Sequence, residues 1–257
     1  MTWFRSPESL LSELGITEPN HIDLEAIAFY LGATVKYRNL DGCAARIVGV
    51  DERAIISVDP RCKEGRKRFS LGHEIGHWMN DRGKGAHLCE NRMISESESG
   101  QNGSETKANK YASDLLLPNS MLKPRLKQRP MTFRTVSDIS EEFRTSLVPA
   151  AIKVVQNGEL PALLVSFNKS GKRRFSKTPI VPDEIWPHDE LHQDTHAFEV
   201  LYGNKTEIGP LPIGAHFWIN HRDSYKYQVI EHSIKTSEDT VYSLLWWKDE
   251  RQICDLI

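Results

Sequence analysis

The sequence lacks a dense cysteine framework, a long apolar run and a large net charge. Its four cysteines (Cys43, Cys62, Cys89 and Cys254) are scattered over 257 residues without a CxxC pair, which argues against a disulfide-stabilised secreted domain. No stretch approaches the roughly 18 apolar residues that are typical of a membrane-spanning helix. The first residues, MTWFRSPESLLSELG, contain no apolar core of a signal peptide. We therefore expect a cytoplasmic protein that has no membrane partner.

The overall composition is that of an ordinary folded protein. Hydrophobic residues make up 39% of the chain and charged residues 26%, so the chain can bury a sizeable core and is not expected to be disordered throughout. The formal net charge is −2. A charge so close to zero gives no general attraction to nucleic acid, so any nucleic-acid site has to come from local clusters of basic side chains.

Two proline-containing joints, near residues 118–130 and 179–187, divide the chain. A chain of this length is long for one domain and comfortable for two. We predict an α+β fold in three parts: a first domain over residues 1–125, a helix-turn-helix-like segment with a hairpin over residues 126–178, and a β-rich domain over residues 179–257.

The periodicity of apolar residues predicts the individual elements. Helices are expected near residues 7–14, 22–31, 65–79 and 105–116, with three short strands between the second helix and the third. Two short helices joined by a tight turn are expected over residues 132–157, followed by a hairpin that turns at residues 169–171. The last part is predicted to contain strands in the runs AFEVLY, AHFWIN, YKYQVIEHSI and VYSLLWWK.

The segment RFSLGHEIGHWMN, residues 68–80, carries the most specific chemical pattern in the chain. Residues four apart on a helix lie one turn apart on the same face, so His73 and His77 can direct both imidazoles at one metal ion. Zinc suits two nitrogen ligands and a carboxylate, with a fourth position open for water. Glu74 lies about 100° around the helix, beside that water, where it can act as the general base and then as the acid of peptide hydrolysis.

A third metal ligand has to come from another element, and a second helix packed against the first would supply it. Glu105 opens the predicted helix ETKANKYASDLLLP, whose alanines on that side are small enough to let two helices approach closely. Asn109, one turn after Glu105, can accept a hydrogen bond from the outer ring nitrogen of a ligand histidine. The alternative is that His73 and His77 are ordinary helix residues, because HExxH alone is a short pattern.

Taken together, RFSLGHEIGH and the following ETKANKYASDLLLP resemble the ImmA/IrrE family of bacterial metallopeptidases. The family pattern is roughly R-F-T-x-A-H-E-x-G-H, then E-x-x-A-N-x-F-A-x-x-L-L-x-P. The resemblance covers about residues 20–165, including the preceding helix and strands. The sequence departs from the pattern at Gly72, where alanine is common, and at Lys107, where a second acid often stands. Lys107 leaves Glu105 as the only carboxylate in that first turn.

The resemblance implies a zincin-like first domain and a zinc-dependent endopeptidase of narrow specificity. Relatives cleave or relieve helix-turn-helix repressors in mobile-element excision, radiation response or anti-phage operons, so the implied partner is a repressor of this type encoded nearby. Several relatives carry a C-terminal sensor domain of the GAF type, and residues 179–257 are a candidate for one. Two alternatives stay open: a non-catalytic DNA-binding regulator that acts through residues 132–157 with a structural zinc, and a toxin–antitoxin partner that acts by binding alone.

Cys89 lies between the histidine helix and Glu105, so the chain tethers it near the metal at both ends of its segment. A thiolate is a strong zinc ligand. Cys89 is therefore a candidate inhibitory ligand that would occupy the open metal position and exclude water. The alternative is that Cys89 is a small apolar residue without a special role, as most lone cysteines are.

Two runs, residues 121–134 and 168–177, are rich in basic side chains and contain no acid. Clustered positive charge attracts phosphates through counterion release, and Phe133 or Phe175 could stack on a base. Single-stranded DNA is therefore a candidate activator of the protein. The alternative is that both runs are solvated surface segments. The candidate nucleic-acid contacts are Lys123, Arg125, Lys127, Arg129, Lys172, Arg173 and Arg174.

Overall fold

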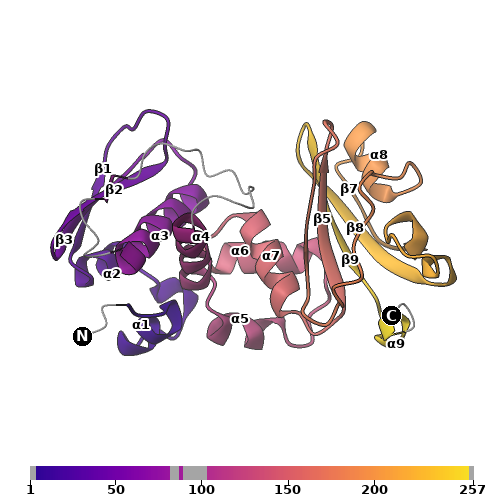
Figure 1. Cartoon of the computed structure of the whole chain (residues 1–257), viewed down its shortest axis with the longest axis horizontal. Helices are drawn as coiled ribbons and strands as arrows, with labels where there is room; N and C mark the ends of the chain where they lie inside the picture. The colour runs from indigo at the N-terminus through magenta and orange to yellow at the C-terminus, as the bar shows by residue number, and fades with distance from the viewer. Residues whose placement is uncertain (1–3, 82–86, 89–102, 255–257) are drawn as a thin grey trace. The chain divides into compact units, whose positions relative to one another are not determined.

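The structure is a computed structural model that describes residues 4–81, 87–88 and 103–254 (Figure 1). The chain divides into two compact units. The first unit consists of Met1–Leu122 and Ser140–Pro149, and the second of Lys123–Ile139 and Ala150–Ile257. No helix within the described residues combines the length and the apolar character that crossing a membrane requires. The fold is mixed α+β, as predicted, and the three-part organisation along the chain stays a prediction.

The first unit combines a small mixed sheet with helices. Its sheet has the strand order β1-β3-β2-β4, in which β1 is parallel to β3 and β2 is antiparallel to both β3 and β4. The strands are β1 (Ala33–Tyr37), β2 (Ala45–Val50), β3 (Arg53–Val58) and β4 (His87–Leu88). The helices are α1 (Pro7–Glu13), the 3-10 helix η1 (Pro19–His21), α2 (Leu24–Tyr30), α3 (Glu64–Asp81) and α4 (Gly103–Leu116).

Short-range capping starts the first two α-helices where the sequence predicts them. Ser6 Oγ accepts a hydrogen bond from the backbone N–H of Ser9 at 3.2 Å, before α1. Asp23 Oδ1 accepts from the backbone N–H groups of Glu25 and Ala26 at 3.0 and 3.1 Å, at the start of α2. Such side chains satisfy the N–H groups that have no partner inside the helix.

Helices α3 and α4 pack closely because small residues face each other across their contact. Gly72 of α3 lies against Ala112 of α4, and Gly76 lies against Ala108. A Cβ added at Gly76 would stand 2.9 Å from the Ala108 carbonyl oxygen, so the two backbones are nearly in contact there. This close packing brings the first turn of α4 beside the histidine-bearing part of α3.

The second unit is built on an antiparallel sheet with the strand order β6-β5-β9-β8-β7. Its strands are β5 (Ala162–Asn168), β6 (Arg173–Lys177), β7 (Glu207–Gly214), β8 (Gln228–Ser237) and β9 (Thr240–Trp246). Its other elements are α8 (His196–Tyr202), the 3-10 helices η2 (Ala215–Phe217) and η3 (Ser224–Lys226), and α9 (Arg251–Cys254). The buried face of the sheet packs against apolar residues of α8, among them Ala197, Val200 and Leu201.

Three helices contribute residues to both units: α5 (Asn119–Leu126), α6 (Phe133–Glu142) and α7 (Leu147–Asn157). The pair α6 and α7 is the expected pair of short helices joined by a tight turn. The hairpin β5–β6 turns at the predicted place, and Gly171 has the positive φ of 78° that the turn requires. Helix α5 was not predicted, because Pro124 lies inside it.

Two of the strands predicted in the C-terminal part are wrong. The run AFEVLY is the helix α8, and AHFWIN begins with the 3-10 helix η2. The start of α8 is stabilised from a distant strand: the Glu231 carboxylate of β8 accepts the backbone N–H groups of His196 and Ala197 at 3.2 and 2.7 Å. A carboxylate at a helix N-terminus accepts from N–H groups that have no partner inside the helix, and it interacts favourably with the positive end of the helix dipole. The sequence pattern around residues 196–202 does not indicate this contact, because Glu231 lies far away along the chain.

Candidate metal centre

Helices α3 and α4 together form a cluster of two imidazoles and one carboxylate. His73 and His77 lie one turn apart on α3, and their Nε2 atoms are 3.0 Å apart. Glu105, in the first turn of α4, places Oε2 at 3.3 Å from His73 Nε2 and Oε1 at 3.2 Å from His77 Nε2. The structure thus brings together the three residues that the sequence names as ligands. Their role as zinc ligands stays a prediction.

The spacing of these atoms fits a tetrahedral zinc ion. Zinc binds imidazole nitrogen and carboxylate oxygen at about 2.0–2.2 Å, so two of its ligand atoms are separated by about 3.3 Å. The observed separations of 3.0, 3.3 and 3.2 Å are close to that value. Two imidazoles and one carboxylate are also a donor set typical of catalytic zinc sites, which leave the fourth position open.

The outer nitrogen of each imidazole is held by a residue of α4. His73 Nδ1 lies 2.9 Å from Asn109 Oδ1, which can only accept, so Nδ1 carries the proton and the Nε2 lone pair faces Glu105. His77 Nδ1 lies 3.4 Å from the Ser104 hydroxyl. Asn109 therefore occupies the supporting position that the sequence predicts for it, and such partners fix the tautomer and the ring orientation of ligand histidines.

Burial prepares His73 for metal binding. The residue is 4% exposed, and this burial lowers the pKa of His73 to about 4, assisted by the neighbouring His77 and opposed by Glu105 and by the Asn109 hydrogen bond. His73 is therefore neutral at pH 7, and its lone pair is available to a metal ion. Glu105, whose side chain is 50% exposed, supplies the negative charge.

Glu74 follows His73 on α3 and is also buried. Its charge affects the thiol of Cys43, which lies in the segment before β2. Burial is the main cause that raises the pKa of Cys43, Arg46 opposes it, and Glu74 raises it further. Cys43 is thus a neighbour of the site that the sequence did not indicate, because nothing in the local pattern links it to α3. The predicted inhibitory ligand Cys89 lies outside the described residues, so its role stays a prediction.

The basic residues predicted to contact nucleic acid have different surroundings in the second unit. Lys123, Lys127 and Lys172 are exposed. Arg129 forms an ion pair with Asp138 at 3.7 Å, and Arg173 forms one with Asp189 at 2.8 Å. Arg173 also donates to the carbonyl oxygen of Pro187, so this side chain is engaged within its own unit. Arg125 and Arg174 are half-buried.

The suggestion that Phe133 stacks on a base is wrong. Phe133 is 5% exposed, and its ring packs against the ring of His232 with centroids 5.2 Å apart. Its backbone N–H also donates to His232 Nδ1 at 3.2 Å. Phe175 is 42% exposed, and the Arg173 guanidinium lies over its ring, 5.3 Å from the centroid.

Comparison with known proteins identifies the region that contains this site. Residues 28–154 match the family model described as the IrrE N-terminal-like domain, a peptidase family. No curated protein matches the chain. Among solved structures, a Mycobacterium tuberculosis transcriptional regulator is similar in fold, with a TM-score of 0.61 and 12% sequence identity over 93% of this chain and 74% of that protein. At this identity the likeness concerns the fold alone.

Proposed function

Through residues 28–154 the chain is a member of the ImmA/IrrE family, and on that basis we propose that it is a zinc-dependent endopeptidase of narrow specificity. The family assigns a metallopeptidase-type domain to this region. The observation that carries the proposal is the cluster of His73, His77 and Glu105, whose separations of 3.0–3.3 Å suit a tetrahedral ion, with the carboxylate of Glu74 next to it in the chain.

The residues of the chain have separate tasks in the proposed reaction. Zinc, when bound, supplies a water molecule whose pKa is lowered to about 7 and polarises the substrate carbonyl. Glu74 accepts a proton from the attacking water and delivers it to the leaving amine, as one residue that is base first and acid afterwards. Asn109 holds His73 in the tautomer whose Nε2 lone pair faces the metal position.

The proposed substrate is a helix-turn-helix transcriptional repressor encoded near this gene. The support is family membership, since relatives act on repressors in stress, DNA-damage or phage-defence responses. The proposal includes single-stranded DNA as an activator, supported by the two acid-free basic runs of the second unit. It also includes a sensor role for residues 179–257, with a GAF-like domain as the expected form.

A cleavage assay with a matched pair of variants tests the proposal. Glu74→Gln removes the base and no ligand, so it should keep one zinc per chain and lower the cleavage rate of the neighbouring repressor by about 100-fold or more. Glu238→Gln, a change of the same kind at an exposed position, should cleave like the wild type. Zinc is measured by elemental mass spectrometry and cleavage by mass spectrometry of the fragments.

Two results would contradict the proposal. One is cleavage by Glu74→Gln at the wild-type rate. The other is free digestion of unfolded casein by an enzyme that ignores the repressor.

A non-catalytic regulator is the second candidate. It is favoured by the fold shared with a protein described as a transcriptional regulator and by the helix pair α6 and α7. A structural zinc site is closed by four protein ligands, whereas the described residues bring only three candidate ligands together. A protein that holds zinc, binds operator DNA and leaves the repressor intact would favour this candidate.

A further inference from the structure

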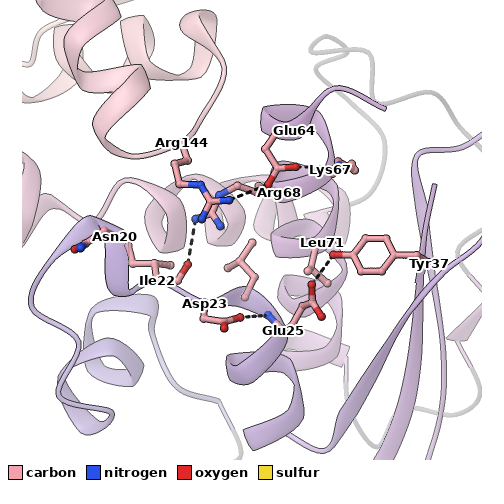
Figure 2. Close-up of a pocket in the computed structure, with 11 residues that line it drawn as sticks. Asn20, Ile22, Asp23, Glu25, Tyr37, Glu64, Lys67, Arg68, Leu71 and Arg144 are labelled. Atoms are coloured by element: carbon pink, nitrogen blue, oxygen red, sulfur yellow. Dashed lines mark hydrogen bonds and ion pairs between the residues drawn. The ribbon is translucent and has the colours of Figure 1, made fainter. Parts of the chain in front are cut away.

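A polar cavity of about 260 Å³ lies in the first unit, beside the N-terminal half of α3 (Figure 2). Its volume is far larger than the roughly 30 Å³ that one water molecule occupies in the liquid, so it has room for a small organic molecule. Figure 2 shows Arg68, Arg144 and Glu64 on one side of the cavity and Asp23 and Glu25 on the other. Both guanidiniums therefore lie on one side, together with Glu64, and two carboxylates lie on the other.

The cavity is separate from the candidate metal centre. The α3 residues that line it recur every three or four positions, at 64, 67, 68 and 71, so they form one face of the helix. His73 and His77 project from the opposite face, about 140° and 180° around the helix from Arg68. A ligand of the cavity would therefore not be a ligand of the metal.

Arg68 is a buried cation that forms no ion pair with the described residues. Its residue is 8% exposed, and Nη2 donates to the carbonyl oxygen of Ile22 at 3.2 Å. Among the described residues, Arg68 Nε has no hydrogen-bond partner and no carboxylate forms an ion pair with the guanidinium. Burial lowers the pKa of Arg68, and the guanidinium of Arg144 lowers it further, whereas the charges of Glu64 and Asp23 act in the opposite direction. A buried charge in this situation is costly unless an anion accompanies it.

The acids around the cavity are already engaged by other groups. Glu64 accepts from Lys67 at 3.0 Å and from Arg144 at 3.2 Å. Glu25 accepts from the Tyr37 hydroxyl at 2.7 Å. Burial, together with the Glu25 hydrogen bond, raises the pKa of Tyr37 to about 12, so this hydroxyl stays a donor at neutral pH. The acids therefore leave Arg68 unmatched.

We propose that the cavity binds a small zwitterion that carries an α-carboxylate and an α-ammonium group, that is, a free amino acid or a dipeptide. The carboxylate matches the planar donor forks of Arg68 and Arg144. The ammonium group is received by Glu25 and Asp23, whose oxygens keep further lone pairs. A phosphate dianion fits less well, because three carboxylates line the same cavity.

The bound zwitterion would connect two parts of the first unit. Arg68 belongs to α3, the helix of the metal ligands, whereas Arg144 belongs to the turn between α6 and α7. A carboxylate shared by both guanidiniums would hold that turn against α3. Binding would therefore raise the thermal stability of the protein, because a ligand that binds only the folded state stabilises it.

Isothermal titration of the full zinc-loaded chain tests this assignment. The probes are glutamate, lysine, Gly-Gly, acetate and inorganic phosphate. Glutamate, lysine or Gly-Gly should bind at least 10-fold more tightly than acetate or phosphate. Comparing the affinity of the best amino acid with that of Gly-Gly shows whether the ligand is a free amino acid or a dipeptide. Binding should persist in His77→Ala, which lacks a metal ligand and keeps the cavity, so the result is independent of the proposed peptidase activity.

Variants of exposed residues keep the test independent of folding defects at Arg68. Arg144→Gln should weaken zwitterion binding at least 10-fold, whereas Arg5→Gln, at a half-buried arginine that is also paired with an acid, should not change it. Glu25→Gln should remove the preference for a zwitterion over acetate. The assignment is overturned if no probe binds at millimolar concentration, if phosphate binds more tightly than every zwitterion, or if Arg144→Gln binds like the wild type.

Discussion

The hydrogen bond between His73 Nδ1 and Asn109 Oδ1 decides which ring nitrogen of His73 faces Glu105. Replacing Asn109 by Leu removes the acceptor and keeps a side chain of similar size. We expect zinc affinity to fall about 10–100-fold, the usual cost of losing such a partner. Competition with a chromogenic chelator measures the affinity.

Lys110→Ala is the control for that variant. Lys110 is the next residue of α4 and only pairs with Asp114 on the surface at 2.9 Å, so its removal should leave zinc affinity unchanged. Equal affinities for Asn109→Leu and the wild type would show that the hydrogen bond does not support a metal ligand.

Asp59, directly after β3, is a residue whose negative charge affects the stability of the protein. Its buried carboxylate accepts from the Arg61 side chain and from the backbone N–H groups of Arg61 and Leu40. These hydrogen bonds, the Arg61 side chain first, hold the pKa of Asp59 well below its usual range. A carboxyl whose pKa is lower in the folded than in the unfolded protein stabilises the fold at any pH above about 3.9, the pKa of the carboxyl in the unfolded chain. That stabilisation is lost as the pH falls below this value.

The corresponding prediction concerns acid stability. Asp59→Asn should be less stable than the wild type at pH 7, and the difference should shrink as pH falls from about 4 towards 2. Urea unfolding at several pH values measures it. A difference that stays constant over this range would rule out the charged form of Asp59 as the stabilising species.

At the scale of the element, the contact between α3 and α4 determines whether Glu105 reaches the histidines. Gly76 and Gly72 both lie in this contact, but the space for an added Cβ differs between them. A Cβ at Gly76 would stand 2.9 Å from Ala108 O and 3.0 Å from Tyr111 Cβ, whereas a Cβ at Gly72 would stand 3.4 Å from Ala112 Cβ. The first spacing forces the helices apart, and the second is an ordinary contact.

Alanine substitutions at these two glycines should therefore have opposite effects. Gly76→Ala should destabilise the protein by about 1–3 kcal/mol through overpacking and weaken zinc binding, because α4 moves with Glu105. Gly72→Ala should stabilise it by up to about 1 kcal/mol, the helix-propensity difference between the two residues. Denaturant midpoints and zinc titrations check both. Equal stability of the two variants would refute this account of the helix contact.

At the scale of the whole molecule, a chain with a net charge of −2 contains two acid-free basic runs, and the basic residues of both belong to the second unit. We expect single-stranded DNA to bind there, with log affinity falling against log salt by about 0.7 for each phosphate contact. Lys127→Glu and Lys172→Glu should weaken binding and make the salt dependence shallower. These exposed lysines are better targets than Arg173, which pairs with Asp189.

Lys248→Glu is the control for charge alone, because Lys248 is exposed in the same unit but outside both runs. Fluorescence anisotropy at two salt concentrations measures binding, and repressor cleavage with and without oligonucleotide measures activation. Binding that does not depend on salt, together with unchanged cleavage, would exclude DNA as the activator.

Much of this protein follows from the sequence alone, because short-range geometry decides it. The helical period puts His73 and His77 on one face, and side chains two or three residues away cap α1 and α2. The position of the β5–β6 turn follows from Gly171, whose φ is positive. The sequence also named Glu105 and Asn109, one turn apart on a second helix, but no local rule shows that they reach the histidines.

Only the tertiary structure decided the features that join distant segments. Glu231 of β8 accepts two backbone N–H groups at the start of α8, where the pattern of AFEVLY predicted a strand. The cavity exists because Arg68 and Arg144, 76 positions apart in the sequence, line one space. The periodicity of apolar residues indicates which helix or strand a residue belongs to and which face it occupies. Which other element packs against that face depends on the tertiary structure. For that reason the histidine pair was predictable, and the unmatched charge of Arg68 was not.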